Sequence, residues 1–93
     1  MLTLDSRFQI PPHVTSSFVE ADAVLLNTRT NQYFALEAVA SRLWALLKEG
    51  KGLREIHQIM RGEYAVQAAE LEQDMLELVR QLMESGLVES AET

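Results

Sequence analysis

Two apolar runs separated by a polar gap occupy the stretch from residue 24 to residue 36. Val24 to Leu26 form the first run and Tyr33 to Leu36 the second, and the gap contains only Asn, Thr, Arg and Gln. Runs of this kind are typical of two paired strands, and asparagine is the non-glycine residue that most readily takes a left-handed turn conformation. The pattern predicts a β-hairpin that turns over residues 27–31.

Two earlier segments also alternate between apolar and polar residues. Arg7 to Ile10 do so briefly before Pro11 and Pro12, which predicts a short edge strand followed by a loop that contains His13, Ser16 and Ser17. Residues 19–26 alternate apolar with acidic and then become continuously apolar, which predicts one strand that is half exposed at its start. With residues 32–36, these segments predict a three-stranded antiparallel meander.

From Leu36 onward the apolar residues recur at spacings of three and four. This is the period of a buried helical face, and it predicts three helices. The first ends at Lys48 and Gly50, the second begins near Leu53 and ends at Gly62, and the third spans residues 68–85 with Gly86 as its C-cap. We expect residues 89–93 to form a frayed tail.

The predicted fold class is α+β: a three-stranded antiparallel sheet followed by three helices in a winged helix-turn-helix-like arrangement. With 93 residues, of which 47% are hydrophobic and 24% charged, the chain has the composition of one globular domain, which we place at residues 1–93. A domain of this size has little room for a deep, water-excluding active site. Composition therefore favours a binding role.

Charge argues against the DNA-binding function that a winged helix first suggests. The net charge is −6, and the third helix has one arginine, Arg80, against five acidic residues: Glu70, Glu72, Asp74, Glu77 and Glu84. Such a helix would be repelled by phosphates, and the same charge argues against an anionic membrane surface. We expect no nucleic-acid or membrane partner.

The residue inventory also argues against an enzyme. There is no cysteine, and His13 and His57 lie in different elements, so we expect no metal site, no cofactor and no catalytic residues. His57 is interpreted as a helix-surface residue and Trp44 as a core residue. No signal peptide or apolar stretch of about 20 residues is present, which predicts a cytoplasmic protein.

The apolar residues of the third helix form two adjacent stripes. The first contains Leu71, Met75, Leu78 and Leu82, and the second contains Leu76, Val79 and Met83. Two interpretations stay open: both stripes are buried, or part of the arc lines a groove, which the adaptable thioethers of the two methionines favour. The strand at residues 32–36 would form the other wall of that groove. An unpaired strand edge beside an apolar groove is suited to an extended peptide.

The sequence resembles the PqqD-like family along residues 18–88, and in particular the free-standing recognition proteins of lasso-peptide biosynthesis. The segments that carry the resemblance are "VLLNTRTNQYFALEAVASRLWALLKEG", "REIHQIM", "YAV" and "DMLELVRQLMESGLV". Within them the matching features are the strand "LLN", the pair Tyr33-Phe34, Leu36, Leu43-Trp44, Leu47, Gly50, Asp74, Leu78, Leu82 and Gly86-Leu87. The combined spacing is more specific than any single motif.

The resemblance implies a domain that binds the leader segment of a ribosomally synthesised precursor peptide. The leader would lie as an added antiparallel strand between the third strand and the third helix, with an aromatic residue and a proline as anchors. The partners implied are a leader peptidase of the cysteine-protease type and a cyclase. The peptide-binding residues predicted in this way, together with the apolar stripe, are Asn31, Gln32, Tyr33, Phe34, Ala35, Leu36, Leu71, Asp74, Met75, Leu78, Val79 and Leu82.

The sequence departs from the family pattern in three places, the first of which is near Asn31, where the family often has glycine. Glu37 stands where the family often has a capping asparagine, and glutamate is a weaker cap. The proline and acidic pattern that follows "LL" in PqqD itself is missing, which favours lasso-peptide synthesis. The alternatives are a PqqD-type peptide chaperone in pyrroloquinoline quinone synthesis and a structural subunit that docks on a partner enzyme.

Overall fold

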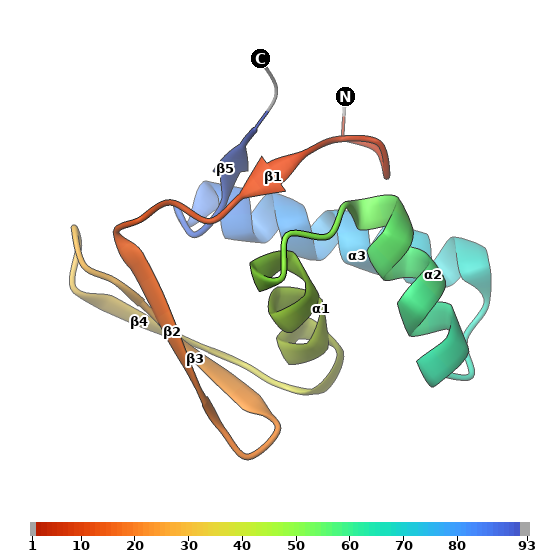
Figure 1. Cartoon of the computed structure of the whole chain (residues 1–93), viewed down its shortest axis with the longest axis horizontal. Coiled ribbons are helices and arrows are strands. Elements are labelled where there is room, and N and C mark those ends of the chain that lie inside the picture. The colour runs from red at the N-terminus through yellow and green to blue at the C-terminus, as the bar shows by residue number, and fades with distance from the viewer. Residues whose placement is uncertain (1, 92–93) are drawn as a thin grey trace.

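A computed structural model of the chain describes residues 2–91, and Figure 1 shows the arrangement of its elements. In chain order the elements are β1 (Phe8–Gln9), β2 (Val14–Val19), β3 (Asp22–Asn27), β4 (Gln32–Leu36), α1 (Ala38–Lys48), α2 (Leu53–Glu63), α3 (Ala68–Glu84) and β5 (Glu89–Ser90). The predicted α+β fold, with a three-stranded antiparallel sheet followed by three helices, is confirmed.

The sheet has the order β2-β3-β4 and is antiparallel throughout. Burial alternates along β3: Ala23, Leu25 and Asn27 are buried, and Val24 and Leu26 are only half-buried. All three helices lie to one side of the sheet, and α1 packs against β3 (Figure 1). The sheet therefore has one face in the core and one face without a helix over it.

The sheet contains a hairpin that the sequence pattern does not reveal. The prediction of one strand over residues 19–26 is wrong, because the chain turns at Glu20 and Ala21, and the predicted loop at residues 13–17 contributes most of β2. Glu20 has a φ of 60°, in the left-handed region that costs an ordinary residue about 1–2 kcal/mol. Neither Glu20 nor Ala21 favours a tight turn, so nothing in the sequence marks this bend.

The second hairpin turn follows the prediction. Asn31 has a φ of 59°, and its N–H donates to the carbonyl of Asn27 at 2.8 Å. The side-chain oxygen of Asn27 accepts a hydrogen bond from the backbone N–H of Arg29 at 3.0 Å, the local contact that suits asparagine to turns. The turn between β3 and β4 is thus stabilised by its own asparagines.

The strand predicted at residues 7–10 does not belong to the three-stranded sheet. β1 pairs instead with β5, with Phe8 opposite Ser90 and Gln9 opposite Glu89. The N–H of Ala91 extends the pairing by donating to the carbonyl of Arg7 at 2.9 Å. The prediction of a frayed tail is therefore wrong for residues 89–91, and residues 92–93 lie outside the described part of the chain. A two-residue strand that pairs with a segment far along the chain leaves no periodic pattern in the sequence by which it could be predicted.

The helices begin and end close to the predicted residues. Gly50 and Gly86 have φ values of 89° and 74°, and their N–H groups donate to Leu47 and Met83, as expected of left-handed C-caps. α2 continues one residue past Gly62. Among the helices of residues 2–91, none is long and apolar enough to cross a membrane.

The core forms where α1 meets the sheet and the other two helices. Its largest fully buried side chains are Trp44, Leu25, Leu43, Leu53, Ile56, Met60, Met75, Leu87 and Val79. The interpretation of Trp44 as a core residue is confirmed. The interpretation of His57 as a surface residue is wrong: it is buried, and its Nε2 lies 2.8 Å from the carbonyl oxygen of Ala68, which connects α2 to the start of α3.

Candidate functional site

β4 is the last strand of the sheet, so one of its edges has no neighbouring strand. The ladder on the other side of β3 shows which backbone groups reach that edge. The N–H of Thr28 donates to the carbonyl of His13 at 2.9 Å, and these two residues face each other next to the pair formed by Val14 and Asn27. In an antiparallel ladder this makes Val14 and Asn27 a non-hydrogen-bonded pair. The backbone N–H and C=O of Asn27 therefore point toward β4.

Along β4 the backbone N–H and C=O groups of successive residues point alternately to β3 and to the free edge. Asn27 faces Gln32, so Gln32, Phe34 and Leu36 direct their backbone groups to β3. Tyr33 and Ala35 direct their N–H and C=O groups to the free edge. These two residues provide the donors and acceptors that an added strand would use.

The side chains of β4 separate in the same way onto the two faces of the sheet. Phe34 and Leu36 are half-buried and pack against the core, whereas Ala35 is exposed and Tyr33 is 70% exposed. Ala38, with a φ of 49°, follows directly and turns the chain from β4 into α1. The free edge thus leads within three residues into the first turn of a helix.

An apolar hollow of about 250 Å³ opens beside that first helical turn. It lies between α1, the connection from α2 to α3, and α3. Its lining is Val39, Ala40, Leu43, Tyr64, Val66, Leu71, Asp74, Met75 and Leu78. Eight of these nine side chains are apolar or aromatic, which is the composition of a site for an apolar group.

The structure divides the predicted residues of the helical wall into two groups. Leu71, Asp74, Met75 and Leu78 line the hollow. Val79 and Leu82 are buried in the core, 0% and 3% exposed, and do not line it. On the strand, Asn31 lies in the turn before β4, and residues 32–36 form β4 itself. Neither open interpretation of α3 describes the whole arc, because part of it is core, part lines the hollow, and Met83 is 39% exposed and belongs to neither.

Five residues of the hollow were not predicted from the sequence. Val39, Ala40 and Leu43 come from α1, and Tyr64 and Val66 from the connection between α2 and α3. The apolar period of the sequence includes these α1 residues, but periodicity does not show which neighbouring element a buried stripe faces. Val66 is 44% exposed in the structure, and the one signal in the sequence is that Tyr64 and Val66 lie in the "YAV" segment that carries the family resemblance.

An ion pair connects α1 to the end of α2 beside this hollow. The guanidinium of Arg42 donates to both carboxylate oxygens of Glu63, at 2.9 Å and 2.6 Å. This hydrogen bonding holds the pKa of Glu63 below its usual value and raises that of Arg42. Arg42 and Glu63 are the neighbours of Leu43 and Tyr64, so the pair fixes two elements that supply the lining.

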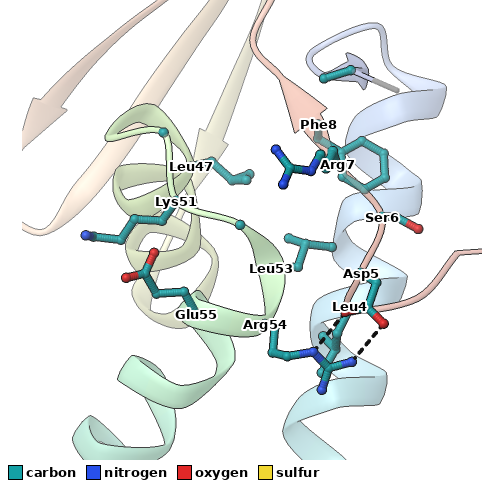
Figure 2. A pocket seen from close by; sticks show the side chains of 13 residues that line it. Leu4, Asp5, Ser6, Arg7, Phe8, Leu47, Lys51, Leu53, Arg54 and Glu55 are labelled. Atoms are coloured by element: carbon teal, nitrogen blue, oxygen red, sulfur yellow. Dashed lines mark hydrogen bonds and ion pairs between the residues drawn. The ribbon is translucent and has the colours of Figure 1, made fainter. Parts of the chain in front are cut away.

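A larger and more polar hollow of about 460 Å³ lies between the N-terminal segment and the start of α2 (Figure 2). Arg54 reaches across it and donates to both carboxylate oxygens of Asp5, at 2.9 Å and 3.1 Å. Lys51 and Glu55 also line it. Its charged walls suit solvent better than an apolar side chain, so size alone does not make it the candidate site.

Within residues 2–91 no group of three or more histidine, aspartate or glutamate side chains is placed to hold a metal ion. His57 is occupied by its backbone partner. What the arrangement can do chemically is bind a chain through the backbone of β4 and hold an apolar side chain in the hollow.

Comparisons with known proteins agree with this geometry. The family described as coenzyme PQQ synthesis protein D (PqqD) matches residues 22–88. The solved structure of TbiB1 in complex with the TbiA(beta) leader peptide is 36% identical in sequence, with a TM-score of 0.87, and the match covers 91% of this chain and 99% of that one. A lasso peptide synthetase B1 complexed with the leader peptide is 26% identical, with a TM-score of 0.82, covering 90% of this chain and 99% of that one. No curated protein matches the chain significantly.

Proposed function

The chain belongs to the PqqD family, and from that premise we propose that it is a non-catalytic domain that binds the leader segment of a ribosomally synthesised precursor of the lasso-peptide type. The family resemblance predicted from the sequence is confirmed. Two proteins of closely similar structure were solved with leader peptides, which supports the same class of ligand for this chain.

One observation carries the proposal: the unpaired edge of β4 is followed at once by α1, whose first turn lines an apolar hollow, although no β4 residue lines it. An extended peptide placed along β4 would form backbone hydrogen bonds to Tyr33 and Ala35. Its alternate side chains would point toward the helices, where the hollow can take one of them. Backbone pairing would supply affinity that is independent of sequence, and the hollow would supply selectivity.

Both contributions are needed because a disordered leader loses conformational entropy when it docks. A single backbone hydrogen bond contributes about 0.5–1.5 kcal/mol net, so the bonds at Tyr33 and Ala35 do not suffice alone. Burying one large apolar side chain contributes about 1.5–3 kcal/mol more. Met75, 1% exposed, and the half-buried Leu78 would form the surface that receives it.

The proposal includes the partners that the sequence resemblance implies. A leader bound at the edge of the sheet would be presented to a cysteine-protease-type leader peptidase and to a cyclase. The precursor is made by the ribosome, so this encounter would take place in the cytoplasm. We further propose that residues 1–93 act as a single recognition domain.

The proposal is tested by titrating isotope-labelled protein with a synthetic peptide that contains the leader of the precursor encoded beside its gene. Backbone amide shifts are followed by NMR. We expect the largest shifts at residues 31–37 and at the residues that line the hollow. The amides of α2 that face the polar hollow of Figure 2 are the internal control and should not move.

Two outcomes would contradict the proposal in different ways. If no amide shifts at high peptide excess while a neighbouring peptidase or cyclase binds, the chain is a docking subunit. If shifts occur only outside β4 and the hollow, a peptide binds elsewhere. The family description also favours a second candidate, a peptide chaperone in pyrroloquinoline quinone synthesis, which would show as preference for that pathway's precursor in a competition titration.

A further inference from the structure

Charge is distributed unevenly around the apolar hollow. The arginine of α1, Arg42, is paired with Glu63, and the arginine of α3, Arg80, is paired with Glu77 and Glu84. These cations are therefore neutralised by partners within the same chain.

Three carboxylates on or next to the helices that form this hollow have no ion pair within residues 2–91. Asp74 lines the hollow and is exposed. Glu70 lies four residues earlier on α3, so it is the neighbour of Asp74 along one side of the helix. Glu37 is the residue between β4 and α1. Asp74 is the charged residue of the hollow's lining, so the charge in its wall is negative.

The other end of β4 has the opposite charge. Arg29 lies in the turn before β4, is exposed, and is outside the ion pairs of the described residues. A peptide along β4 would thus meet carboxylates near Leu36 and a guanidinium near Asn31. A cationic side chain is attracted to the first end and repelled from the second.

We propose that the leader carries a lysine or arginine on the N-terminal side of the apolar residue that fills the hollow, and that Asp74, with Glu70 and Glu37, binds it. The inference rests on the proposed function, because an antiparallel peptide begins beside Leu36 and ends beside Gln32. Its N-terminal part therefore lies at the acidic end. The apolar anchor and the preceding cation together define the class of peptide that this site selects.

The size of the effect follows from the exposure of these carboxylates. Exposed ion pairs contribute up to about 1 kcal/mol, so losing one partner should weaken binding by up to about fivefold. The contribution should be largely screened when the Debye length falls from about 14 Å to about 4 Å, as it does between roughly 50 mM and 500 mM salt. Burial of the apolar anchor is insensitive to salt over this range, so the two contributions separate.

The experiment uses the dye-labelled leader peptide of the precursor encoded beside the gene, titrated at low and high salt with fluorescence anisotropy. A second peptide has alanine in place of the basic residue. The protein variants are Asp74→Asn and, as a matched control, Glu20→Gln in the exposed β2–β3 turn. We expect Asp74→Asn and the alanine peptide each to weaken binding by up to about fivefold at low salt, with no further loss when combined. Glu20→Gln should bind as the original protein does.

Three results would overturn the inference. A leader that binds but has no basic residue before its anchor contradicts it directly. If both peptides bind with equal affinity, the cation is not bound at all. If the losses are additive when the Asp74→Asn variant is titrated with the alanine peptide, the cation is bound elsewhere. In these cases peptide binding persists and the proposed function stands, whereas absence of binding by the unmodified pair overturns both.

Discussion

The two free edges of the sheet have the same kind of backbone and very different surroundings. β2 and β4 are both outermost strands. Beside β2 lies a hollow of about 500 Å³ whose lining mixes apolar residues with Gln9, Ser16 and Lys48. β4 leads into a hollow half that size with an almost wholly apolar lining. The side chains next to a strand, rather than its unpaired groups, distinguish a binding edge from an ordinary one.

The β2 edge is also partly occupied by the chain that precedes it. By the same alternation, Val14, Ser16 and Phe18 direct their backbone groups away from β3. The N–H of Val14 already donates to the carbonyl of Pro11 at 3.0 Å, and Pro11 is buried. A proline beside an edge strand is a known means of preventing strand addition. β4 has no such protection along Tyr33 and Ala35.

The largest expected difference between the edges comes from placing a charge in each hollow. Leu78→Asp puts a carboxylate into the apolar hollow beside β4, and we expect leader affinity to fall at least about thirtyfold, because about 2 kcal/mol of apolar contact is lost and a charge is desolvated. Thr15→Asp makes the equivalent change beside β2 and should leave affinity unchanged. Isothermal titration calorimetry measures both.

Circular dichroism must show that Leu78→Asp is folded, and Leu82→Ala provides the contrast. Leu82 is 3% exposed and belongs to the core, so its truncation should lower the free energy of unfolding by about 2–5 kcal/mol while the folded protein still binds the leader. A folded Leu78→Asp variant with normal affinity would remove Leu78 from the site.

The next largest difference tests the backbone groups themselves. Ala35→Pro removes an N–H from the β4 edge, and we expect about a threefold to tenfold loss of leader affinity, the value of one hydrogen bond. Ser16→Pro removes the corresponding N–H from the β2 edge and should have no effect on binding. If both proline variants bind equally, the leader does not pair with β4.

A smaller effect concerns stability without binding. Glu20→Gly relieves the left-handed strain in the turn that joins β2 to β3, and we expect the free energy of unfolding in urea to rise by about 1 kcal/mol. That turn lies between β2 and β3, so leader affinity should not change. A loss of stability would mean that the turn adopts a different conformation in solution.

The smallest effect is the acid dependence of two ion pairs, one beside the apolar hollow and one across the polar hollow of Figure 2. Arg42 lowers the pKa of Glu63 below 4.5, so the stabilisation is present above pH 4.5 and is lost as pH falls through the lowered value. Arg54 likewise lowers the pKa of Asp5 below 3.8, so the stabilisation from this pair is lost at a more acidic pH. Urea unfolding at successive pH values should show that the free energy of unfolding declines less below pH 4.5 in the Glu63→Gln variant than in the original protein. An unchanged decline would mean that the pair is open in solution.

The helices, β4 and the asparagine turn could be predicted because each is encoded locally. Gly50, Gly86 and Asn31 all take positive φ values at the predicted ends and turn. The β2–β3 hairpin could not be predicted, because Glu20 is held in a strained conformation by the pairing of the strands rather than by its own preference. β5 is likewise encoded only by its contact with β1, some eighty residues earlier.

About half of the candidate site is visible in the sequence for the same reason. The amphipathic period of α3 identifies Leu71, Met75 and Leu78, but it does not separate them from Leu82, which faces the core. That distinction depends on how α1 and the α2–α3 connection pack on α3. Tyr64 and Val66 belong to no periodic segment, so only the folded structure places them in the hollow.

The pairing of β1 with β5 has a practical consequence for building larger assemblies. It holds the first and last described strands side by side, at the opposite end of the view from the β2–β3 turn (Figure 1). A tether attached at either end would therefore leave the molecule on the same side, away from the β4 edge (Figure 1). A short flexible tether gives a linked enzyme an effective concentration in the millimolar range. Fusion of this chain at its N-terminus or at its C-terminus to a processing enzyme should then deliver a bound precursor equally well.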